Sequence, residues 1–334
     1  MAEKRKVLLV TTGGTITMLR NGGGTLSQCQ DAGILTERVP ELGELAEVDL
    51  VSVSNTDSSN IQPGLWVDTA RAIYERMDDY DGFVVTHGTD TICYTSAALA
   101  FMLQELPRPV VATGAQVPLD DIGSDGHRNL INAVRVAVSD VAEVTVAFGS
   151  EIINGTRAKK TSVFDMQAIT SVNAYPLGNI GLFIKFNAAA RKRGPRKVLF
   201  QPFLNDSVAA VHVYPGFDPA ILDYLASTHA GVVLGGYGAG NIPTEVKSLI
   251  PAIRAATDRG VPVVICTQCI IGSTQMELYE VGRAALDAGA IPAMDMTPET
   301  ALVKLMWVLG QTDDLARVTS LMQKPFAGEL HAQS

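Results

Sequence analysis

Short valine-rich apolar runs alternate along this chain with longer segments of helical periodicity, and this alternation constrains the fold more than any other feature. Strands that alternate with helices are typical of parallel βαβ units. In the first half, the apolar runs occupy residues 6–12, 48–54, 82–88, 109–115 and 143–150. Glycine, serine or threonine lies near the end of each run, so polar loops are expected to gather at one edge of a parallel sheet.

Helical segments are expected between and after these runs. Apolar residues recur at helical spacing over residues 65–77, and residues 97–103 predict a buried helix. A helix is also expected over residues 244–260, and Thr297 followed by Pro298 is a typical cap and first-turn pair for another. The runs that predict strands in the second half are residues 208–215, 230–238 and 261–268.

Length and composition indicate two globular α/β domains. The chain has 334 residues, of which 47% are hydrophobic and 18% charged, and this size favours two domains over one. Basic and helix-breaking residues cluster at residues 191–197, before the strand pattern resumes at Val208. We therefore expect a larger N-terminal parallel-sheet domain over residues 1–190, a linker over residues 191–207, and a smaller C-terminal α/β domain over residues 208–334.

Charge and hydropathy restrict the partners. The formal net charge of -9 argues against a nucleic acid or an anionic membrane as partner, because both would demand a basic surface. The basic stretch at residues 191–197 lacks interleaved aromatic residues, so a nucleic-acid patch there is the weaker interpretation. The apolar run at residues 7–10 is too short for a signal-peptide core or a membrane span. We expect a cytoplasmic protein that acts on a small molecule.

The cysteines do not predict a disulfide framework. There are four in the chain, Cys29, Cys93, Cys266 and Cys269, too few to staple a chain of this length. Cys266 and Cys269 form one C-x-x-C pair, which follows an apolar run and has no second pair or nearby histidine. We interpret both as small residues at a strand end.

Two strand ends carry threonines beside glycines: TTGGT at residues 11–15 and THGTD at residues 86–90. Glycines let a backbone come close to a ligand, and ligands bind at the carboxyl ends of the strands in an open parallel sheet. Both loops are therefore expected to meet at one pocket, although each by itself is also typical of a structural turn. A dinucleotide or phosphate loop is excluded, because there is no G-x-G-x-x-G after the first strand and no G-K-[ST].

A hydrolytic site needs a nucleophile, a proton acceptor and donors aimed at the developing oxyanion. A threonine hydroxyl serves as nucleophile when an adjacent base activates it. Lysine is one such base when it is buried, and Lys159 and Lys160 are adjacent in NGTRAKKT. His87, in the second loop, is the competing base, with hydrogen bonding to a loop as its alternative role.

Six motifs spread along the chain carry a family resemblance. They are TTGGTI (11–16), HGTDT (87–91), TGAQVP (113–118), SDGHRNL (124–130), NGTRAKK (154–160) and GNIP (240–243). Together they resemble the bacterial-type L-asparaginases, most closely the cytoplasmic type I branch. The likeness extends from the first strand to GEL at residues 328–330, and the combination of TGGTI with HGTDT is specific to this family.

The resemblance implies an α/β amidohydrolase that releases ammonia from L-asparagine through a threonine acyl-enzyme, without metal or cofactor. Thr15 matches the nucleophile. Thr89 and Asp90 match the second catalytic threonine and the carboxylate that holds the substrate ammonium, and Lys160 matches the lysine that bridges them. Taken singly, Asp90 is also typical of a helix cap, and Lys160 of a solvated surface charge.

The resemblance also implies a set of substrate-binding residues. Ser58 and Ser59 match residues that hold the substrate α-carboxylate, although singly they are also typical turn residues. Asn241 and Glu277 match positions that, in the type II branch of the family, reach from one subunit into the pocket of its partner, which predicts a homodimer or homotetramer. Glu277 has no usual counterpart in the type I branch. The full set is Gly14, Asp57, Ser58, Ser59, Gly88, Ala115, Asn241 and Glu277.

Several positions depart from the family pattern. Thr25 stands where a mobile lid usually carries a tyrosine, so closure over the substrate is expected to differ. Cys269 matches a cysteine of an allosteric asparagine site in the type I branch, but Gly235 and Lys159 replace its arginine and threonine. We therefore expect that the allosteric site is lost.

Two other functions stay open. The ammonia-generating D subunit of the archaeal glutamyl-tRNA amidotransferase shares the fold, but it usually carries an extra N-terminal domain, whereas the first motif here begins at residue 11. A catalytically idle amino-acid or nucleotide sensor is the other alternative. Release of ammonia from asparagine separates an enzyme from a sensor, whereas the preference between asparagine and glutamine depends on pocket geometry.

Overall fold

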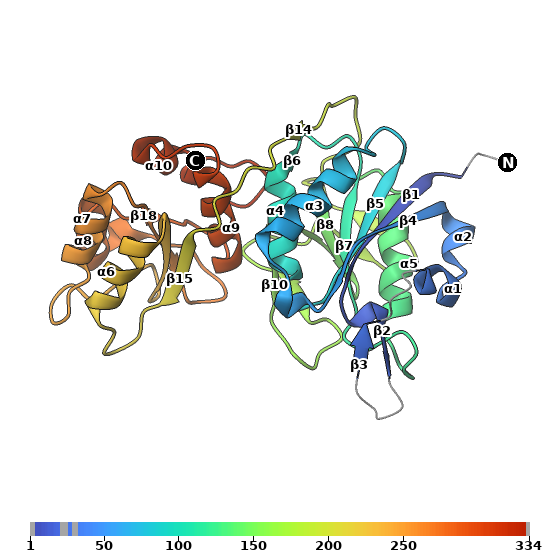
Figure 1. Cartoon of the computed structure of the whole chain (residues 1–334), viewed down its shortest axis with the longest axis horizontal. Helices are drawn as coiled ribbons and strands as arrows, with labels where there is room; N and C mark the ends of the chain where they lie inside the picture. Colours follow the sequence, from blue (N-terminus) through green and yellow to red (C-terminus); the bar gives the residue numbers. More distant parts are fainter. Residues whose placement is uncertain (1–3, 21–25, 29–32, 332–334) are drawn as a thin grey trace. The chain divides into compact units, whose positions relative to one another are not determined.

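The computed structural model describes residues 4–20, 26–28 and 33–331. The chain divides into two compact units, Met1–Pro202 and Phe203–Ser334 (Figure 1). The division falls within the segment expected as a linker. Each unit is an α/β structure built on its own sheet, as the alternation of apolar runs and helical segments predicts.

An eight-stranded sheet forms the centre of the N-terminal unit, with the strand order β13-β12-β9-β8-β7-β5-β1-β4. The five neighbouring strands from β8 to β4 are parallel, and they are the five that the sequence predicts. Their bounds are β1 (Lys6–Gly13), β4 (Glu47–Thr56), β5 (Gly82–Thr86), β7 (Val110–Thr113) and β8 (Val144–Phe148). Strands β1, β5, β7 and β8 are almost wholly buried, as expected for parallel strands covered on both faces.

Three short antiparallel strands extend this sheet beyond the prediction: β9 (Glu151–Asn154), β12 (Gly178–Ile180) and β13 (Ile184–Phe186). The chain turns from β8 into β9 at Gly149, whose φ of +58° favours glycine. A Cβ at this position would also lie 2.0 Å from the Oε1 atom of Gln167. Strands of three or four residues contain too little alternation to be recognised in the sequence.

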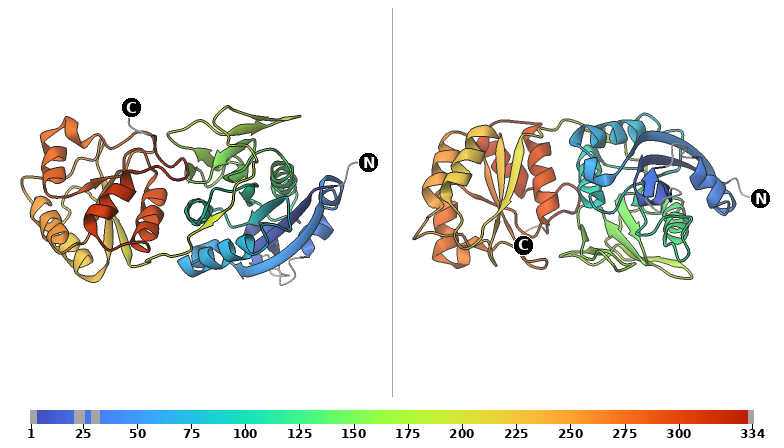
Figure 2. Two further views of the ribbon diagram at one scale, coloured as in Figure 1. Left: turned by 90° about the horizontal axis from the view of Figure 1, so that it is seen from above. Right: turned by 60° about the horizontal axis from the view of Figure 1, so that its bottom comes forward.

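Helices cover both faces of the N-terminal sheet (Figure 2). On one face, α1 (Ile34–Arg38), α2 (Leu42–Leu45) and α5 (Gly126–Ala137) pack with alternate strand residues in one hydrophobic cluster. The other face carries α3 (Pro63–Tyr74) and α4 (Ile92–Met102), which contact β1, β4, β7 and β8. Helices α3 and α4 confirm the two helices predicted for this half of the chain.

Shorter elements complete the N-terminal unit, and some of them carry site residues. The 3-10 helices η1 (Thr15–Thr17) and η2 (Ser58–Asn60) follow β1 and β4, respectively. The antiparallel pairs are β10 (Ala158–Lys160) with β11 (Ile169–Ser171), β2 (Met18–Arg20) with β3 (Leu26–Gln28), and β6 (Leu103–Gln104) with β14 (Leu199–Phe200).

The basic run at residues 191–197 is bound to the N-terminal unit. Arg193 donates to the carbonyls of Asp81, Ala137 and Ser139 at 2.6, 2.8 and 2.6 Å. The last two carbonyls lie at the end of α5, where carbonyls have no partner within the helix and positive charge is favourable. Burial lowers the pKa of Arg193 to about 10. This arginine is therefore part of the fold of the unit.

A four-stranded parallel sheet of order β15-β16-β17-β18 forms the centre of the C-terminal unit. Its strands are β15 (Val208–His212), β16 (Gly231–Gly236), β17 (Val263–Thr267) and β18 (Ile291–Pro292). Its helices are α6 (Pro219–Thr228), α7 (Ile250–Asp258), η3 (Met276–Leu278), α8 (Glu280–Asp287), α9 (Pro298–Leu309) and α10 (Leu315–Gln323). The first three strands confirm the three predicted for this half.

Two helix starts in the C-terminal unit test the sequence predictions. The helix expected over residues 244–260 was predicted too long, since α7 begins at Ile250. Lys247 has a φ of +54°, which no α-helix contains. For α9 the prediction is confirmed: the Thr297 side chain accepts a hydrogen bond from the N–H of Thr300 at 3.2 Å.

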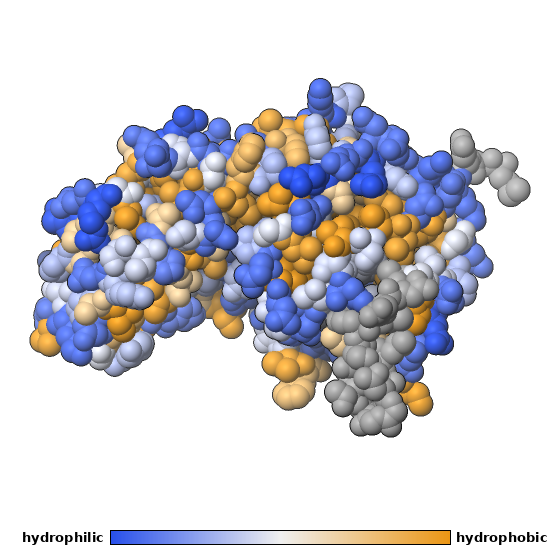
Figure 3. Space-filling view, viewed as in Figure 1, coloured by the Kyte–Doolittle hydropathy of each residue, from blue (hydrophilic) through white to orange (hydrophobic). Residues whose placement is uncertain are grey.

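Apolar side chains lie among the charged ones on the surface, as the face drawn in Figure 3 illustrates. In the N-terminal unit, Ile122, Phe164 and Tyr175 are each more than nine-tenths exposed, and in the C-terminal unit Ile271 is 78% exposed. Within the part of the chain that the structure describes, no helix has the length and apolar character needed to cross a membrane.

Candidate active site

Three loops at the carboxyl edge of the N-terminal sheet come into close contact. They follow β1, β4 and β5 and contain Gly14, Ser58 and Gly88. A Cβ on Gly14 would lie 2.3 Å from the nitrogen of Gly88, and a Cβ on Gly88 would lie 2.5 Å from the hydroxyl oxygen of Ser58. Gly14 also has a φ of +91°, so this position favours glycine for its conformation as well as for space. The two glycine loops therefore meet, as the sequence predicts.

Thr15 begins η1 directly after Gly14. A hydrogen bond of 3.0 Å from the N–H of Thr17 to the carbonyl of Gly14 closes the turn, and Ile16 and Thr17 are buried. Thr15 itself is half-buried, and its hydroxyl has no hydrogen-bond partner among the residues that the structure describes. The backbone is thus held while the hydroxyl stays available to a ligand. Thr25, where the lid departs from the family pattern, lies outside the described residues.

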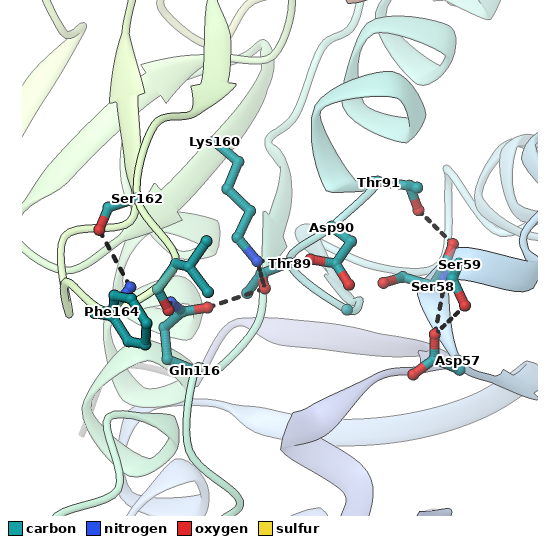
Figure 4. A network of polar contacts seen from close by, with 12 residues as sticks. Asp57, Ser58, Ser59, Thr89, Asp90, Thr91, Gln116, Lys160, Ser162 and Phe164 are labelled. Atoms are coloured by element: carbon teal, nitrogen blue, oxygen red, sulfur yellow. Dashed lines mark hydrogen bonds and ion pairs between the residues drawn. The ribbon is translucent and has the colours of Figure 1, made fainter.

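Lys160, Thr89 and Asp90 form a hydrogen-bonded group (Figure 4). The Lys160 ammonium at the end of β10 lies 2.8 Å from Thr89 Oγ1 and 2.7 Å from Asp90 Oδ1. Thr89 is buried and Asp90 is exposed. The Lys160 side chain is 20% exposed and that of Asp90 is 64% exposed. One lysine therefore bridges a buried hydroxyl and a carboxylate that a ligand can reach.

The structure excludes one of the two interpretations of Asp90, that of a helix cap. Thr91 occupies the N-cap position of α4, and no side-chain hydrogen bond caps this helix. Asp90 is directed instead to Lys160. The Asp90 carboxylate is largely exposed, so its ion pair contributes little to stability, and its placement beside Thr89 favours a role in chemistry.

His87 does not have the geometry of a general base. Its ring is completely buried, with Nδ1 at 2.7 Å from the carbonyl of Gly88 and Nε2 at 2.7 Å from Thr95 Oγ1. A carbonyl only accepts, so Nδ1 carries the proton and Nε2 accepts from Thr95. Burial lowers the pKa of His87 to about 4. The neutral ring therefore supports the loop that carries Gly88 and Thr89, which was its alternative role.

Residues 57–59 form a fixed turn beside the glycine loops. The Asp57 carboxylate accepts from the N–H and the hydroxyl of Ser59 at 2.9 and 2.6 Å, and these hydrogen bonds lower the pKa of Asp57. The hydroxyl of Thr91 donates to the carbonyl of Ser58 at 2.7 Å. In Figure 4 this turn lies on the opposite side of Asp90 from Lys160. The turn interpretation is therefore confirmed, and because the Ser59 hydroxyl gives its single proton to Asp57, the binding role expected for these serines stays a prediction.

Gln116 belongs to this network, although the sequence did not single it out. The Thr89 hydroxyl donates to Gln116 Oε1 at 3.0 Å. The backbone N–H groups of Gln116 and Val117 both donate to Asp125 Oδ1 at 3.0 Å, and Asp125 is buried. The motif TGAQVP is thus hydrogen-bonded to the motif SDGHRNL through Asp125. The presence of Gln116 in one of these family motifs is the sequence signal that could have indicated it.

Three other expected binding residues have no side-chain hydrogen bond to this network among the described residues. The Ala115 side chain is fully buried in the core, so only its backbone is placed to contact a ligand. Asn241 and Glu277 belong to the C-terminal unit, where Glu277 is exposed in η3. The Oδ1 atom of Asn241 is buried and has no hydrogen-bond partner among the described residues. The roles expected for Asn241 and Glu277 stay predictions.

The assembled residues are suited to nucleophilic chemistry on an uncharged carbonyl. A threonine hydroxyl can attack, a lysine and a second threonine can move its proton, and backbone N–H groups near Gly14 and Gly88 can face an oxyanion. Exposed Asp90 suits an ammonium group. Among the described residues, no three histidine, cysteine or acidic side chains come together as a metal site requires.

Two family models match the chain almost end to end. Residues 6–192 match the asparaginase N-terminal model, and residues 207–322 match the glutaminase/asparaginase C-terminal domain. An L-asparaginase from Thermococcus kodakarensis is 40% identical over 329 residues, which cover 97% of this chain and 99% of that protein. The D subunit of the glutamyl-tRNA(Gln) amidotransferase from Methanosarcina mazei is 38% identical over 343 residues, covering 98% of this chain and 79% of that protein.

Solved structures agree with these matches. The thermostable L-asparaginase from Thermococcus kodakarensis superposes with a TM-score of 0.92 at 37% identity, covering 98% of this chain and 100% of that chain. L-asparaginase I from Vibrio cholerae gives a TM-score of 0.89 at 32% identity, covering 98% and 99% of the two chains. With both domains matched by family models and a relative 40% identical over nearly the whole chain, the chain belongs to the asparaginase family of amidohydrolases.

Proposed function

We propose that this chain is an L-asparaginase, which hydrolyses L-asparagine to L-aspartate and ammonia. The observation that carries the proposal is the hydrogen-bonded group of Lys160, Thr89 and Asp90 at the loops that carry Gly14 and Thr15. This group is suited to a proton relay without histidine, and the loop that carries it packs against Gly14, directly before Thr15.

In the first half of the reaction, the Thr15 oxygen attacks the side-chain amide carbon of asparagine. Its proton passes to Thr89 Oγ1 and from there to Lys160, which accepts it as the neutral amine. The tetrahedral intermediate collapses, and the amide nitrogen takes a proton from the same pair and leaves as ammonia. In the second half, water attacks the acyl-enzyme ester, a proton returns to the Thr15 oxygen, and aspartate is released. The N–H groups of the two glycine loops are suited to the oxyanion.

The charged ends of the substrate have matching groups beside the relay. The Asp90 carboxylate is suited to the α-ammonium by a charge-assisted hydrogen bond. The Ser58 hydroxyl is suited to donate to the α-carboxylate, whereas the Ser59 hydroxyl donates its single proton to Asp57 and would have to turn away from it to do so. Asparagine and glutamine differ by one methylene group, and a pocket discriminates such a difference by about 1–3 kcal/mol.

Ammonia release from L-asparagine by the purified chain and by Thr15→Ala tests this function. Wild type should release ammonia and aspartate in equal amounts, and Thr15→Ala should lose at least about 1,000-fold in kcat with its unfolding midpoint unchanged. Thr228→Ala, at the end of α6, is a matched control and should keep full activity. Wild-type rates in a folded Thr15→Ala protein would rule out this nucleophile, and a wild type that binds asparagine without turnover would favour a sensor.

A second candidate function has a specific observation in its favour. Several relatives at 37–39% identity are D subunits of glutamyl-tRNA(Gln) amidotransferases. One component of such an enzyme should release little ammonia from free asparagine when it is assayed by itself. Efficient release from asparagine by the isolated chain supports the asparaginase proposal, whereas turnover that requires a tRNA-bound partner supports the alternative.

We also propose that the protein acts in the cytoplasm as a homodimer or homotetramer. Support for both comes from the similarity of its motifs to the cytoplasmic type I branch. The buried Asn241 Oδ1 atom adds a physical argument for assembly, since it lacks a hydrogen-bond partner within the described residues and such acceptors are costly to leave unsatisfied.

A further inference from the structure

The side-chain amide of Gln116 connects the proposed relay to a loop of fixed conformation. This loop, residues 161–168, joins β10 to β11. The N–H of Thr161 donates to the carbonyl of Ala168 at 2.8 Å across its base. The hydroxyl of Ser162 accepts from the N–H groups of Phe164 and Asp165 at 3.2 and 2.9 Å. The loop carbonyls are therefore fixed by hydrogen bonds within the loop.

Two of these carbonyls determine the orientation of the Gln116 amide. Gln116 Nε2 lies 2.9 Å from the carbonyl of Val163 and 3.5 Å from that of Asp165. Carbonyls only accept, so the amide group that faces them must be the NH2. The oxygen of the same amide then faces Thr89, and the short contact of 3.0 Å requires that the Thr89 hydroxyl donates its proton to Gln116.

This orientation propagates to the lysine. Because the Thr89 proton is directed to Gln116, the lone pairs of Thr89 Oγ1 are left for the ammonium of Lys160, which lies 2.8 Å away. Lys160 completes the chain by donating to Asp90 at 2.7 Å. Each of these hydrogen bonds therefore has a defined donor. Lys160 donates to Asp90 and to Thr89, Thr89 donates to Gln116, and Gln116 donates to the loop carbonyls.

We propose that Gln116 is a positioning residue that acts through Thr89. It fixes the rotation of the Thr89 hydroxyl, and with it the direction of the lone pairs that Thr89 Oγ1 presents to Lys160 and to an incoming proton, through its hydrogen bonds to carbonyls of the 161–168 loop. The inference rests on the proposed asparaginase function, but it concerns a residue with no chemistry of its own. Loss of such orientation affects the rate of the chemical step more than the binding of substrate.

Gln116→Met tests the proposal, because methionine has a similar length but neither accepts from Thr89 nor donates to the loop. We expect kcat for asparagine to fall by about 10- to 100-fold while KM changes less than about threefold. Gln104→Met is the matched control. Gln104 is another half-buried glutamine whose Nε2 atom donates to a backbone carbonyl, that of Phe101 at 2.9 Å, and its replacement should leave both constants unchanged.

A double-mutant cycle separates action through Thr89 from a general structural role. In the Thr89→Val background, Gln116→Met should cost less than about twofold more, whereas in the Thr89→Ser background its effect should persist. Residual rates are measured from ammonia accumulated over long incubations. If Gln116→Met does not fold, Gln116→Glu completes the same cycle, since it cannot donate to the two carbonyls.

The outcomes distinguish the inference from the function on which it rests. A Thr89→Val protein with normal turnover would overturn the proposed relay itself. A slow Thr89→Val protein in which Gln116→Met costs the same factor as in wild type would overturn the role of Gln116 and leave the relay standing. A rise in KM with kcat unchanged would also overturn it, because Gln116 would then act on binding.

Discussion

Two adjacent lysines show how side-chain direction decides the function of a residue. Successive residues of a strand point to opposite sides, and in β10 it is Lys160 that reaches Thr89 and Asp90. Lys159 pairs with Thr170 in the neighbouring strand β11 and is directed away from this group. From the motif NGTRAKK alone, either lysine could be the one beside Thr89. The alternation of side chains along β10 selects Lys160.

Lys160→Met should lower kcat for asparagine by about 100- to 10,000-fold, because proton transfer through Thr89 is lost. Lys159→Met is the matched control and should remain within about threefold of wild type. Both are measured as ammonia release at saturating asparagine, with circular dichroism as a check on the fold. A larger loss at Lys159 than at Lys160 would contradict the assignment.

His87 makes the stability of the protein dependent on pH. Burial lowers its pKa from 6.5 to about 4, so the folded state favours the neutral ring. As the pH falls below 6.5, the unfolded chain binds a proton at this residue and the folded chain does not. The contribution of His87 is therefore complete above pH 6.5 and is lost as the pH falls toward 4.

His87→Gln should isolate this contribution. Wild type should be more stable than the variant at pH 7, and the difference in the free energy of unfolding should shrink by roughly 2 kcal/mol between pH 7 and pH 5. Urea unfolding at a series of pH values measures it, and other titrating groups cancel in the difference. A gap that does not depend on pH would show that His87 titrates normally in the folded protein.

At the scale of elements, a buried ion pair attaches the C-terminal segment to α9. The side chains of Lys304 and Glu329 are both 0% exposed and lie 2.6 Å apart. Lys304 also donates to the carbonyls of Met322 and Lys324, and Glu329 accepts from the N–H of Phe326. Desolvation lowers the pKa of Lys304. Its charge is tolerated because every partner is in place.

Lys304→Met should reduce the free energy of unfolding by about 3–5 kcal/mol, because Glu329 would be left as a buried charge without its cation. The double variant Lys304→Met/Glu329→Gln removes that charge as well and should be more stable than Lys304→Met. Urea midpoints at constant m-value measure both. A double variant that is less stable than the single one would mean that Glu329 does not depend on the lysine charge.

The end of β16 bears on regulation by substrate. A Cβ on Gly235 would lie 2.9 Å from His212 Cδ2 and 3.3 Å from Gln268 Cγ. Gln268 is itself fixed by hydrogen bonds of 2.6 Å to the carbonyls of Val213 and Gly235. A larger side chain at residue 235 would therefore have to displace its neighbours. This crowding favours the expected loss of the allosteric site, which stays a prediction.

The rate of ammonia release should therefore depend hyperbolically on asparagine concentration, with a Hill coefficient of about 1. A dense series of concentrations on both sides of KM measures it. Sigmoidal kinetics would mean that a second asparagine site persists in altered form. The variant Cys269→Ser provides a check, since it should not change the curve if the site is lost.

At the scale of the whole molecule, the residues expected in one site divide between two units. Thr15, Thr89 and Lys160 belong to the N-terminal unit, whereas Asn241 belongs to the C-terminal unit. If assembly brings Asn241 of one subunit to the pocket of its partner, a closed two-fold dimer contains two equivalent composite sites. Two inactive variants can then complement one another.

Mixing Thr15→Ala chains with Asn241→Ala chains should restore activity toward about one quarter of the wild-type level. Random exchange makes half of the dimers mixed, and one of the two sites in each mixed dimer carries neither substitution. Ammonia release after subunit exchange measures it, with each variant alone as control. Mixed chains that exchange subunits and stay inactive would exclude a shared site.

Much of this molecule follows from local pattern. The apolar runs determine the five parallel strands, because buried parallel strands must be continuously apolar. Glycines beside threonines at two strand ends predict where the candidate site lies, because loops at the carboxyl edge of a parallel sheet converge. The helix starting at Pro298 follows from its Thr297 cap. Each of these depends on neighbours in the sequence.

The tertiary structure decided what depends on residues that are distant in the sequence. Lys160 meets Asp90 across 70 positions, and this contact excludes the role of Asp90 as a helix cap. Arg193 binds the carbonyls at the end of α5, so the basic run is not a solvated patch there. Gln116 enters the site through Thr89 and the carbonyls of the 161–168 loop. A sequence pattern records which groups a residue carries, whereas burial and hydrogen-bond geometry determine which of those groups are used.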